Sequence, residues 1–236
     1  MVNGDFLDFV QADPWDNTAG DLEAQSIDRV PLCHRESDSL EKLSRILTRH
    51  NTIFMALGHL LDREDRRLTI LPGNHDADFF WPGVRKEFTK ALTGGNLERT
   101  RRLLFLLERV YRPPAAPYVW IEHGHQYDPL NSFFITGRPG AGNDEEYWSE
   151  SRPPIMDDER GVPRLIECIG TRFLIRFINR LDENYPFVDN IKPFSRFFGL
   201  FGSSMASLKG GTARAAVSIM AMQQYAIRTV ATRPGD

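Results

Sequence analysis

Residues 67–76 read RLTILPGNHD, and this stretch is the most informative one about the fold class. Its apolar run Leu68–Leu71 is short and ends at Pro72-Gly73, which is typical of a buried β-strand followed by a sharp turn. Three polar residues, Asn74, His75 and Asp76, come directly after the turn. Because ligands of layered α/β proteins bind where strands end, the sequence predicts part of a functional site here.

Two further stretches have the same arrangement. Residues 1–8 read MVNGDFLD and have the character of a strand end followed by acidic residues, whereas residues 118–125 read YVWIEHGH and place histidines after an apolar run. Loops that follow neighbouring strands converge, so one site is expected to collect the polar residues of all three stretches. The additional candidates are Asp5, Asp8, His123, His125, Asp128 and Asn131.

Helical spacing of apolar residues appears between these stretches. It predicts helices over about 39–62, 83–92 and 97–111, with Asp38 or Ser39 capping the first. Residues 128–163 are rich in Pro, Gly and acidic residues and are expected to form a long loop, and residues 163–231 are expected to be mostly helical. Strands that alternate with helices predict a layered α/β fold.

Composition excludes several classes of protein. The chain has 236 residues and a net charge of −3, and its 41% hydrophobic and 26% charged residues are ordinary for a globular protein. The slightly acidic balance argues against a nucleic-acid partner. No apolar run approaches the roughly 18–20 residues that span a bilayer. Two cysteines, Cys33 and Cys168, are too few for a disulfide scaffold and indicate a reduced, cytoplasmic protein.

The three motifs, taken in order, resemble the calcineurin-like metallophosphoesterase family. The pattern is strand–GDxxD at Gly4–Asp8, strand–GNHD at Gly73–Asp76 and strand–HG at His123-Gly124. GNHD is the most specific of the three, and each of the others is weak alone. The resemblance covers about residues 1–131 and implies a layered β-sandwich flanked by helices, a metal-dependent phosphatase-like architecture.

The resemblance also implies roles for individual residues. Asp5 would bridge two metal ions, while Asn74 and His123 would bind the second ion. His75 would protonate the leaving group or stabilise the transition state, and Asp76 would orient His75. The residues that would support these ligands or contact the substrate are Asp8, His125, Asp128 and Asn131.

This ligand set suits phosphoester hydrolysis. The mixed nitrogen and oxygen donors accept Mn, Fe, Zn or Ni. Two such ions can share a hydroxide and clamp a phosphate, so the expected substrate is a phosphomonoester, a phosphodiester or a pyrophosphate. The simpler alternative, that these are ordinary turn and cap residues, explains each of them singly but explains the ordered set poorly.

Two elements of the family pattern are missing. There is no Asp-x-His before Gly4 and no Gly-His-x-His after His125, because the remaining histidines are His34, His50 and His59. One explanation is a single domain, residues 1–236, that is truncated at both ends and inactive alone. The other is a non-catalytic relative that keeps the fold as a binding module and has lost the paired-metal site.

The last third has a character of its own. Apolar residues of 166–181 follow helical spacing, and Arg172, Arg176 and Arg180 lie on another face. Residues 132–231 are expected to be a loop and helical insertion, with residues 164–202 as either plain core or a lid. A lid would contact a lipid-like substrate or the inner face of a membrane. Otherwise the substrate is a phosphorylated small molecule, and the sequence leaves the oligomeric state open.

Overall fold

In this computed structural model, the described residues are 1–12, 34–108, 110–128, 131–135, 146–147, 153–158, 160–166, 168, 170–171 and 174–175. The chain divides into two compact units, residues 1–168 and 169–236, and the first of them contains all three predicted motifs. Cys33 and nearly all of the expected helical lid over residues 164–202 lie outside the described residues. The lid and the single-domain organisation therefore stay predictions.

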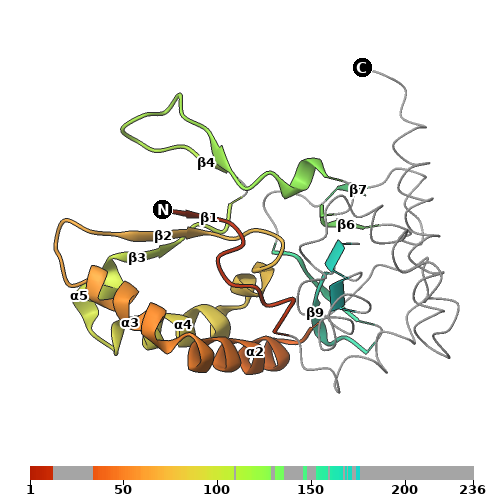
Figure 1. The fold of residues 1–236 in the computed structure, drawn as a ribbon. Coiled ribbons are helices and arrows are strands. Elements are labelled where there is room, and N and C mark those ends of the chain that lie inside the picture. Colours follow the sequence, from red (N-terminus) through yellow and green to blue (C-terminus); the bar gives the residue numbers. More distant parts are fainter. Residues whose placement is uncertain are drawn as a thin grey trace, which may run out of the picture. The chain divides into compact units, whose positions relative to one another are not determined.

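A parallel sheet of three short strands organises the first unit (Figure 1). Its strands are β1 (Val2–Asn3), β2 (Leu68–Leu71) and β3 (Leu103–Phe105), in that order. Val2 pairs with Ile70, and Leu68 pairs with Leu103. Parallel strands need crossover connections, which the helices between them supply. This confirms the predicted α/β class in its coarse form, a mixed fold with a small parallel sheet flanked by helices.

Helices cover one side of this sheet (Figure 1). They are α2 (Glu36–Arg49), α3 (Asn51–Leu60), α4 (Pro82–Thr93) and α5 (Leu97–Arg101), and the 3-10 turns are η1 (Ala77–Phe80) and η2 (His125–Tyr127). Helix α4 begins at Pro82, whose fixed φ suits a first helical position, and ends at Gly94 with a φ of +59°. The helix predicted over 83–92 is confirmed.

The core between sheet and helices contains a cluster of packed aromatic rings among aliphatic side chains. Phe79 and Phe88 are fully buried and meet edge to face, with ring centroids 5.1 Å apart. Phe9 packs against Phe79 and Phe54 against Phe88 in the same T-shaped manner, at 5.6 and 5.9 Å. Each such contact adds roughly 0.5–1.5 kcal/mol beyond burial of area. Because Phe9 directly follows Asp8, and Phe79 lies just beyond Asp76, this core anchors the loops that carry the candidate site.

Two of the predicted helices are wrong in detail. The helix expected over 39–62 is two helices, because the backbone leaves helical geometry at His50, where φ is −114° and ψ is 28°. Asp38 does not stand at the N-cap but three residues inside, where its carboxylate accepts from the Arg35 N–H at 3.0 Å. The helix expected over 97–111 ends at Arg101, since Leu103 is buried by pairing with β2.

Short antiparallel pairs occupy the stretch expected to be a strand followed by a loop. They are β4 (Val110–Tyr111) with β5 (Ile121–Glu122), β6 (Phe134–Ile135) with β7 (Glu146–Tyr147), and β8 (Ile155–Asp157) with β9 (Pro163–Leu165). The strand predicted over 118–122 is thus shorter than expected, and its first residues are not buried. Tyr118 is 88% exposed and Trp120 55% exposed.

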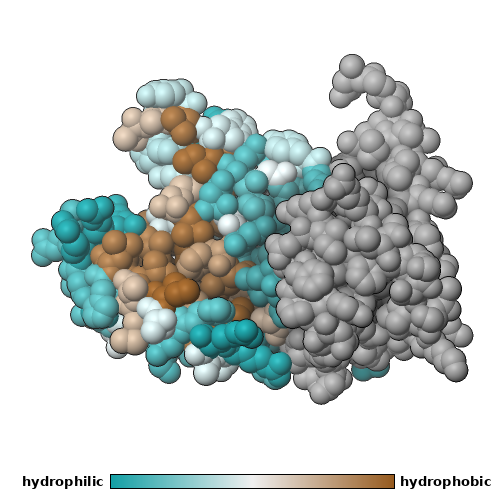
Figure 2. Space-filling view, viewed as in Figure 1, coloured by the Kyte–Doolittle hydropathy of each residue, from teal (hydrophilic) through white to brown (hydrophobic). Residues whose placement is uncertain are grey.

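The surface of the first unit has distinct hydrophilic and apolar areas. In the coloured part of Figure 2, the outer side of α2 is hydrophilic, and apolar side chains show where the sheet meets the helices. Among the residues described, no helix is both long and apolar enough to cross a membrane.

Candidate metal centre

The loops after β1 and β2 leave the same edge of the sheet. The two strands are parallel neighbours, with Asn3 opposite Leu71, and the Gly4 N–H donates to the Leu71 carbonyl at 2.7 Å. This pairing brings residues 4–8 and residues 73–76 side by side, although they are far apart in the sequence. The predicted meeting of these two motifs at one place is confirmed.

A buried carboxylate joins the two loops. Asp76 is 0% exposed, and its oxygens accept from the backbone N–H groups of Gly73 at 2.5 Å, Phe6 at 2.8 Å and Asp5 at 3.2 Å. Burial raises the pKa of Asp76 to about 6, against the opposing effect of those N–H donors. Asp76 therefore acts as a link between the loops and not as the partner of His75 that the sequence analysis expected.

Asp8 takes the role that was assigned to Asp76. The Oδ2 atom of Asp8 lies 3.2 Å from Nδ1 of His75. Burial lowers the pKa of His75, but the hydrogen bond and negative charge of Asp8 outweigh this and hold it above its usual value. The physical reason for the difference is geometric, because Asp76 turns inward to the backbone amides of residues 5, 6 and 73. With Nδ1 directed at Asp8, Nε2 of His75 is the nitrogen left for other chemistry.

Asp5 and His123 form the centre of the cluster. Oδ2 of Asp5 lies 3.2 Å from Nε2 of His123, and Oδ1 accepts from the His75 backbone N–H at 3.0 Å. Burial raises the pKa of Asp5, but the hydrogen bonds from His123 and from the His75 amide prevail and lower it. The hydrogen bond to Asp5 raises the pKa of His123, against the smaller effect of burial. Both shifts favour the charged pair, a carboxylate beside an imidazolium, when no cation is bound.

The second ring nitrogen of His123 is also engaged. Nδ1 lies 3.2 Å from the backbone carbonyl of Asn3, which can only accept a hydrogen bond. This contact directs Nε2 at Asp5, which is the arrangement found in histidines that bind metal ions through one nitrogen. The Asn3 side chain donates to the Glu122 carbonyl at 2.9 Å, so the end of β5 is fixed to the end of β1.

Two glycines make this approach possible. A Cβ built at Gly73 would collide with Oδ1 of Asp5 and lie 2.8 Å from Nε2 of His123, and one at Gly4 would overlap the His123 ring. Gly4 also has a φ of +74°, and Asp5 itself has a φ of +50°, which non-glycine residues seldom adopt. Such backbone strain is typical of functional sites. The carboxylate and imidazole therefore share a space that any side chain at position 73 would fill.

Asn74 reaches the same edge from β2. It is 6% exposed, and its Nδ2 group lies 3.4 Å from Oδ1 of Asn131. Asn131 in turn donates to Oδ2 of Asp128 at 2.6 Å. These three predicted residues are therefore brought together in one hydrogen-bonded chain.

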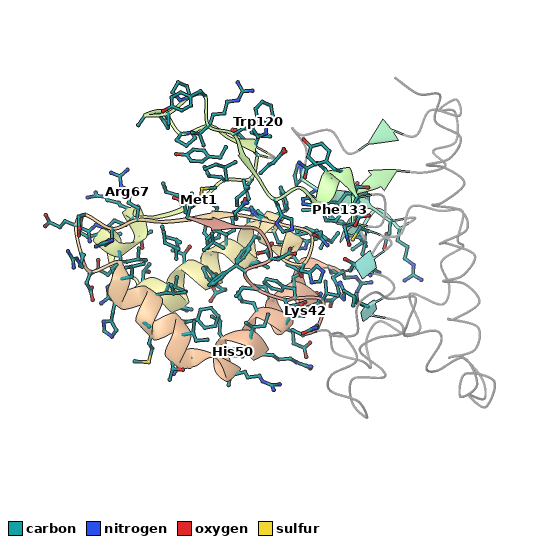
Figure 3. All side chains as sticks on the ribbon, turned by 45° about the horizontal axis from the view of Figure 1, so that its top comes forward. Met1, Lys42, His50, Arg67, Trp120 and Phe133 are labelled. Carbon is teal, nitrogen blue, oxygen red and sulfur yellow. The ribbon has the colours of Figure 1, made fainter. Side chains whose placement is uncertain are left out.

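His125 lies beside His123. Their ring centroids are 5.3 Å apart, and His125 also meets the edge of Phe133, labelled in Figure 3, at 5.5 Å. Both contacts are packing between rings. His125 therefore lies beside the Asp5–His123 pair and is not a member of it.

A buried polar cluster next to the site was not predicted from the sequence. Lys42 of α2 (Figure 3) is 1% exposed, and its Nζ atom lies 3.1 Å from Nδ1 of His34 and 3.5 Å from Oδ1 of Asp78. Asp78 belongs to η1 and lies just beyond Asp76 in the chain. The signal was present in the spacing, since Ser39, Lys42, Leu43 and Ile46 all lie on the buried face of α2.

The donor types present at this edge of the sheet suit a divalent cation. A carboxylate, an imidazole and an amide oxygen from Asp5, His123 and Asn74 are ligand types that Mn, Fe, Zn and Ni accept, and Gly73 leaves room where the first two meet. Within the described ranges, no three His, Cys, Asp or Glu side chains are placed to hold a metal ion together.

The described part of the chain defines an α/β protein whose parallel strands end in a cluster of acid, amide and imidazole groups. Comparison with family models, with curated proteins and with solved structures gives no match. The function must therefore be inferred from the geometry of this cluster.

Proposed function

We propose that this cluster is the centre of a metal-dependent phosphoester hydrolase, in which Asp5, Asn74 and His123 hold a divalent cation and His75 is the proton donor. The observation that carries the proposal is the convergence of three strand ends on Asp5. Its carboxylate lies 3.2 Å from Nε2 of His123 and accepts from the His75 backbone N–H at 3.0 Å, and the His75 ring is held by Asp8 at 3.2 Å. The family resemblance of the three motifs and the calcineurin-like sandwich architecture form the finer part of this proposal.

A cation held by Asp5, Asn74 and His123 would supply Lewis-acid chemistry, namely polarisation of a phosphoryl oxygen and a lowered pKa of water. The protein residues do the rest. Asp5 offsets positive charge at the centre, and Asn74 adds an oxygen donor without adding charge. The pairing of Nδ1 with Asp8 holds the His75 ring, and its raised pKa favours the protonated form of the ring. Nε2–H of His75 can then donate to the departing oxygen of the ester.

The substrate class stays open within this proposal. The site residues describe only the recognition of a phosphoryl group, so phosphomonoesters, phosphodiesters and pyrophosphates are all compatible with them. A lipid-like substrate, peripheral membrane contact and a second metal ion would each depend on residues outside those described.

Binding and hydrolysis are tested separately. Isothermal titration of the 236-residue protein with Mn²⁺ should show one site per chain, and His123→Gln should weaken binding by at least about tenfold. With Mn²⁺ present, we expect slow hydrolysis of p-nitrophenyl phosphate or bis-p-nitrophenyl phosphate. Substitution His75→Gln should lower kcat by about 10²-fold while leaving the Mn²⁺ affinity unchanged. Absence of Mn²⁺ binding by the wild-type chain would refute the proposal.

A second candidate is a non-catalytic binding protein with the same fold. It is favoured by one observation, namely that no three acidic, histidine or cysteine side chains of the described residues form a metal site. This candidate predicts that inorganic phosphate or a phosphate ester binds with no turnover. Measurable hydrolysis that is lost in His75→Gln would exclude it.

A further inference from the structure

We propose that Asp128 and Asn131 are positioning residues that fix the direction of the Asn74 amide, so that its oxygen, and not its NH2 group, faces the cation. This inference rests on the proposed metal site and deepens it. It assigns a specific task to two residues that the sequence analysis could place only near the centre.

Asn131 and Ser132 are held to Asp128 by hydrogen bonds. The Asp128 backbone carbonyl accepts from the N–H groups of Asn131 at 3.0 Å and Ser132 at 2.8 Å. The Asp128 carboxylate accepts from Nδ2 of Asn131 at 2.6 Å. Side chain and main chain of Asn131 are thus both attached to one residue, which gives the Asn131 amide a defined orientation.

The chemistry of donors and acceptors then determines the rest. A carboxylate accepts hydrogen bonds and donates none, so Asn131 must present its NH2 group to Asp128 and direct its oxygen the other way. That oxygen lies 3.4 Å from Nδ2 of Asn74, toward the long end of hydrogen-bond distances. Only the NH2 group of Asn74 can donate to it. The Asn74 oxygen is therefore left for the opposite side.

This orientation matters because an amide has two unlike ends. An oxygen carries partial negative charge and binds a cation, whereas an NH2 group repels it. Asn74 is 6% exposed, so water contributes little to selecting between the two orientations. Asp128, which follows His123 closely in the chain, would thus control a ligand on the other loop.

Two variants test this, each with two readouts. Asp128→Asn keeps the size of the side chain but can present either an oxygen or an NH2 group, so it no longer dictates the direction of Asn131. Asn131→Leu removes the acceptor for Asn74. Asp65→Asn, at an exposed surface carboxylate, is the matched control. Thermal unfolding of each variant establishes that it is folded, and the isosteric Asp128→Asn decides the matter if Asn131→Leu does not fold.

The first readout needs no metal. Proton exchange of the Asn74 side-chain NH2 group, measured by 15N NMR on the full chain, should be at least about fivefold faster in both variants than in the wild type and the control, because a hydrogen bond that protects it is weakened. The second readout is the Mn²⁺ affinity by titration, which should fall about 10–100-fold in both variants, as is usual when a group that orients a metal ligand is removed.

The outcomes are separable. Unchanged Asn74 exchange in both variants overturns the positioning role, and so does loss of Mn²⁺ affinity without any change in exchange. A wild-type chain that binds no Mn²⁺ refutes the proposed function, and the exchange measurement still decides whether Asp128 and Asn131 fix the amide.

Discussion

The ends of β2 and β5 both supply candidate ligands, but they are built differently. The loop after β2, residues 72–76, is buried except at His75 and is held by backbone N–H groups that converge on one carboxylate. The segment after β5, residues 123–128, is only partly buried and is held by side-chain contacts such as His123 with Asn3 and Gln126 with Glu122. The first forms a fixed framework, and the second adds the imidazole to it.

This difference indicates that the two regions contribute differently to folding and to metal binding. Substitutions on the β2 side should affect folding and the site together, because the same bonds serve both. Those on the β5 side should affect metal binding with little change in stability. A series of measurements can test this contrast, beginning with the one for which the largest effect is expected.

The largest effect is expected at Lys42, which supports the β2 side through Asp78. Lys42→Met would leave the Asp78 carboxylate buried without its cation, and should lower the free energy of unfolding by about 3–5 kcal/mol. Urea denaturation measures this. The double variant Lys42→Met with Asp78→Leu removes both charges and should recover most of the loss. A decrease below about 1 kcal/mol in Lys42→Met would show that the pair does not support this loop.

Asp76 should give the β2 side a characteristic pH dependence. Its folded pKa of about 6 lies above the ordinary 3.8, so the folded state binds this proton more tightly than the unfolded state. The associated stability is full below pH 3.8 and is lost as the pH rises through about 6, by about 3 kcal/mol in total. Urea unfolding of metal-free protein from about pH 4 to pH 7 should show this slope, and Asp76→Asn should lack it. Identical slopes in the two proteins would contradict the assignment.

Gly73→Ala should disturb framework and site together. Its Cβ would meet Oδ1 of Asp5 and Nε2 of His123, so the loops must separate, at about 1–3 kcal/mol of unfolding free energy. Mn²⁺ affinity should fall as well. Gly95→Ala is the control, because a Cβ there meets nothing within 4 Å and only its φ of +81° opposes the change. That control should lose stability but keep its Mn²⁺ affinity.

On the β5 side, the affinity for Mn²⁺ should depend on pH through His123. Because the bond to Asp5 raises the pKa of His123 above 6.5, its proton persists at higher pH and must leave before a cation can bind. Affinity should therefore rise with pH from about 6 upward, by at most about tenfold per unit for this one proton. His50→Gln, at the exposed junction of α2 and α3, should leave the profile unchanged. A flat profile in the wild type would argue against His123 as a ligand.

The smallest effect is expected in the β4–β5 hairpin. The Arg112 guanidinium lies 4.2 Å from the centroid of the Trp120 ring, labelled in Figure 3. Tyr111 pairs with Ile121 between β4 and β5, so the next two residues along, Arg112 and Trp120, lie opposite each other. Arg112→Met should lower stability by about 0.5–1 kcal/mol at this exposed position and should not change Mn²⁺ affinity. A larger loss would mean that the hairpin supports the site more than its exposure indicates.

Local signals were sufficient for some of the elements and not for others. The strand at residues 68–71 was predictable because an apolar run of strand length ends at Pro72-Gly73, and the positions of Asp5, Asn74 and His123 followed from strand ends that converge. The region 97–111 was not predictable, since its leucines satisfy helical spacing equally well. Pairing of Leu103–Phe105 with β2 selects the strand there, and that is a contact between distant segments.

Which carboxylate serves which group depends on tertiary contacts. Asp8 and Asp76 both belong to the predicted motifs, and both are aspartates. Residue type therefore cannot show which of them pairs with His75. Packing turns Asp76 inward to three backbone amides from two loops, which leaves Asp8, 67 positions away in the chain, to hold His75. The same holds for Lys42 with Asp78. The physical reason is that hydrogen-bond partners in a folded chain are selected by direction and burial, which sequence spacing does not encode across loops.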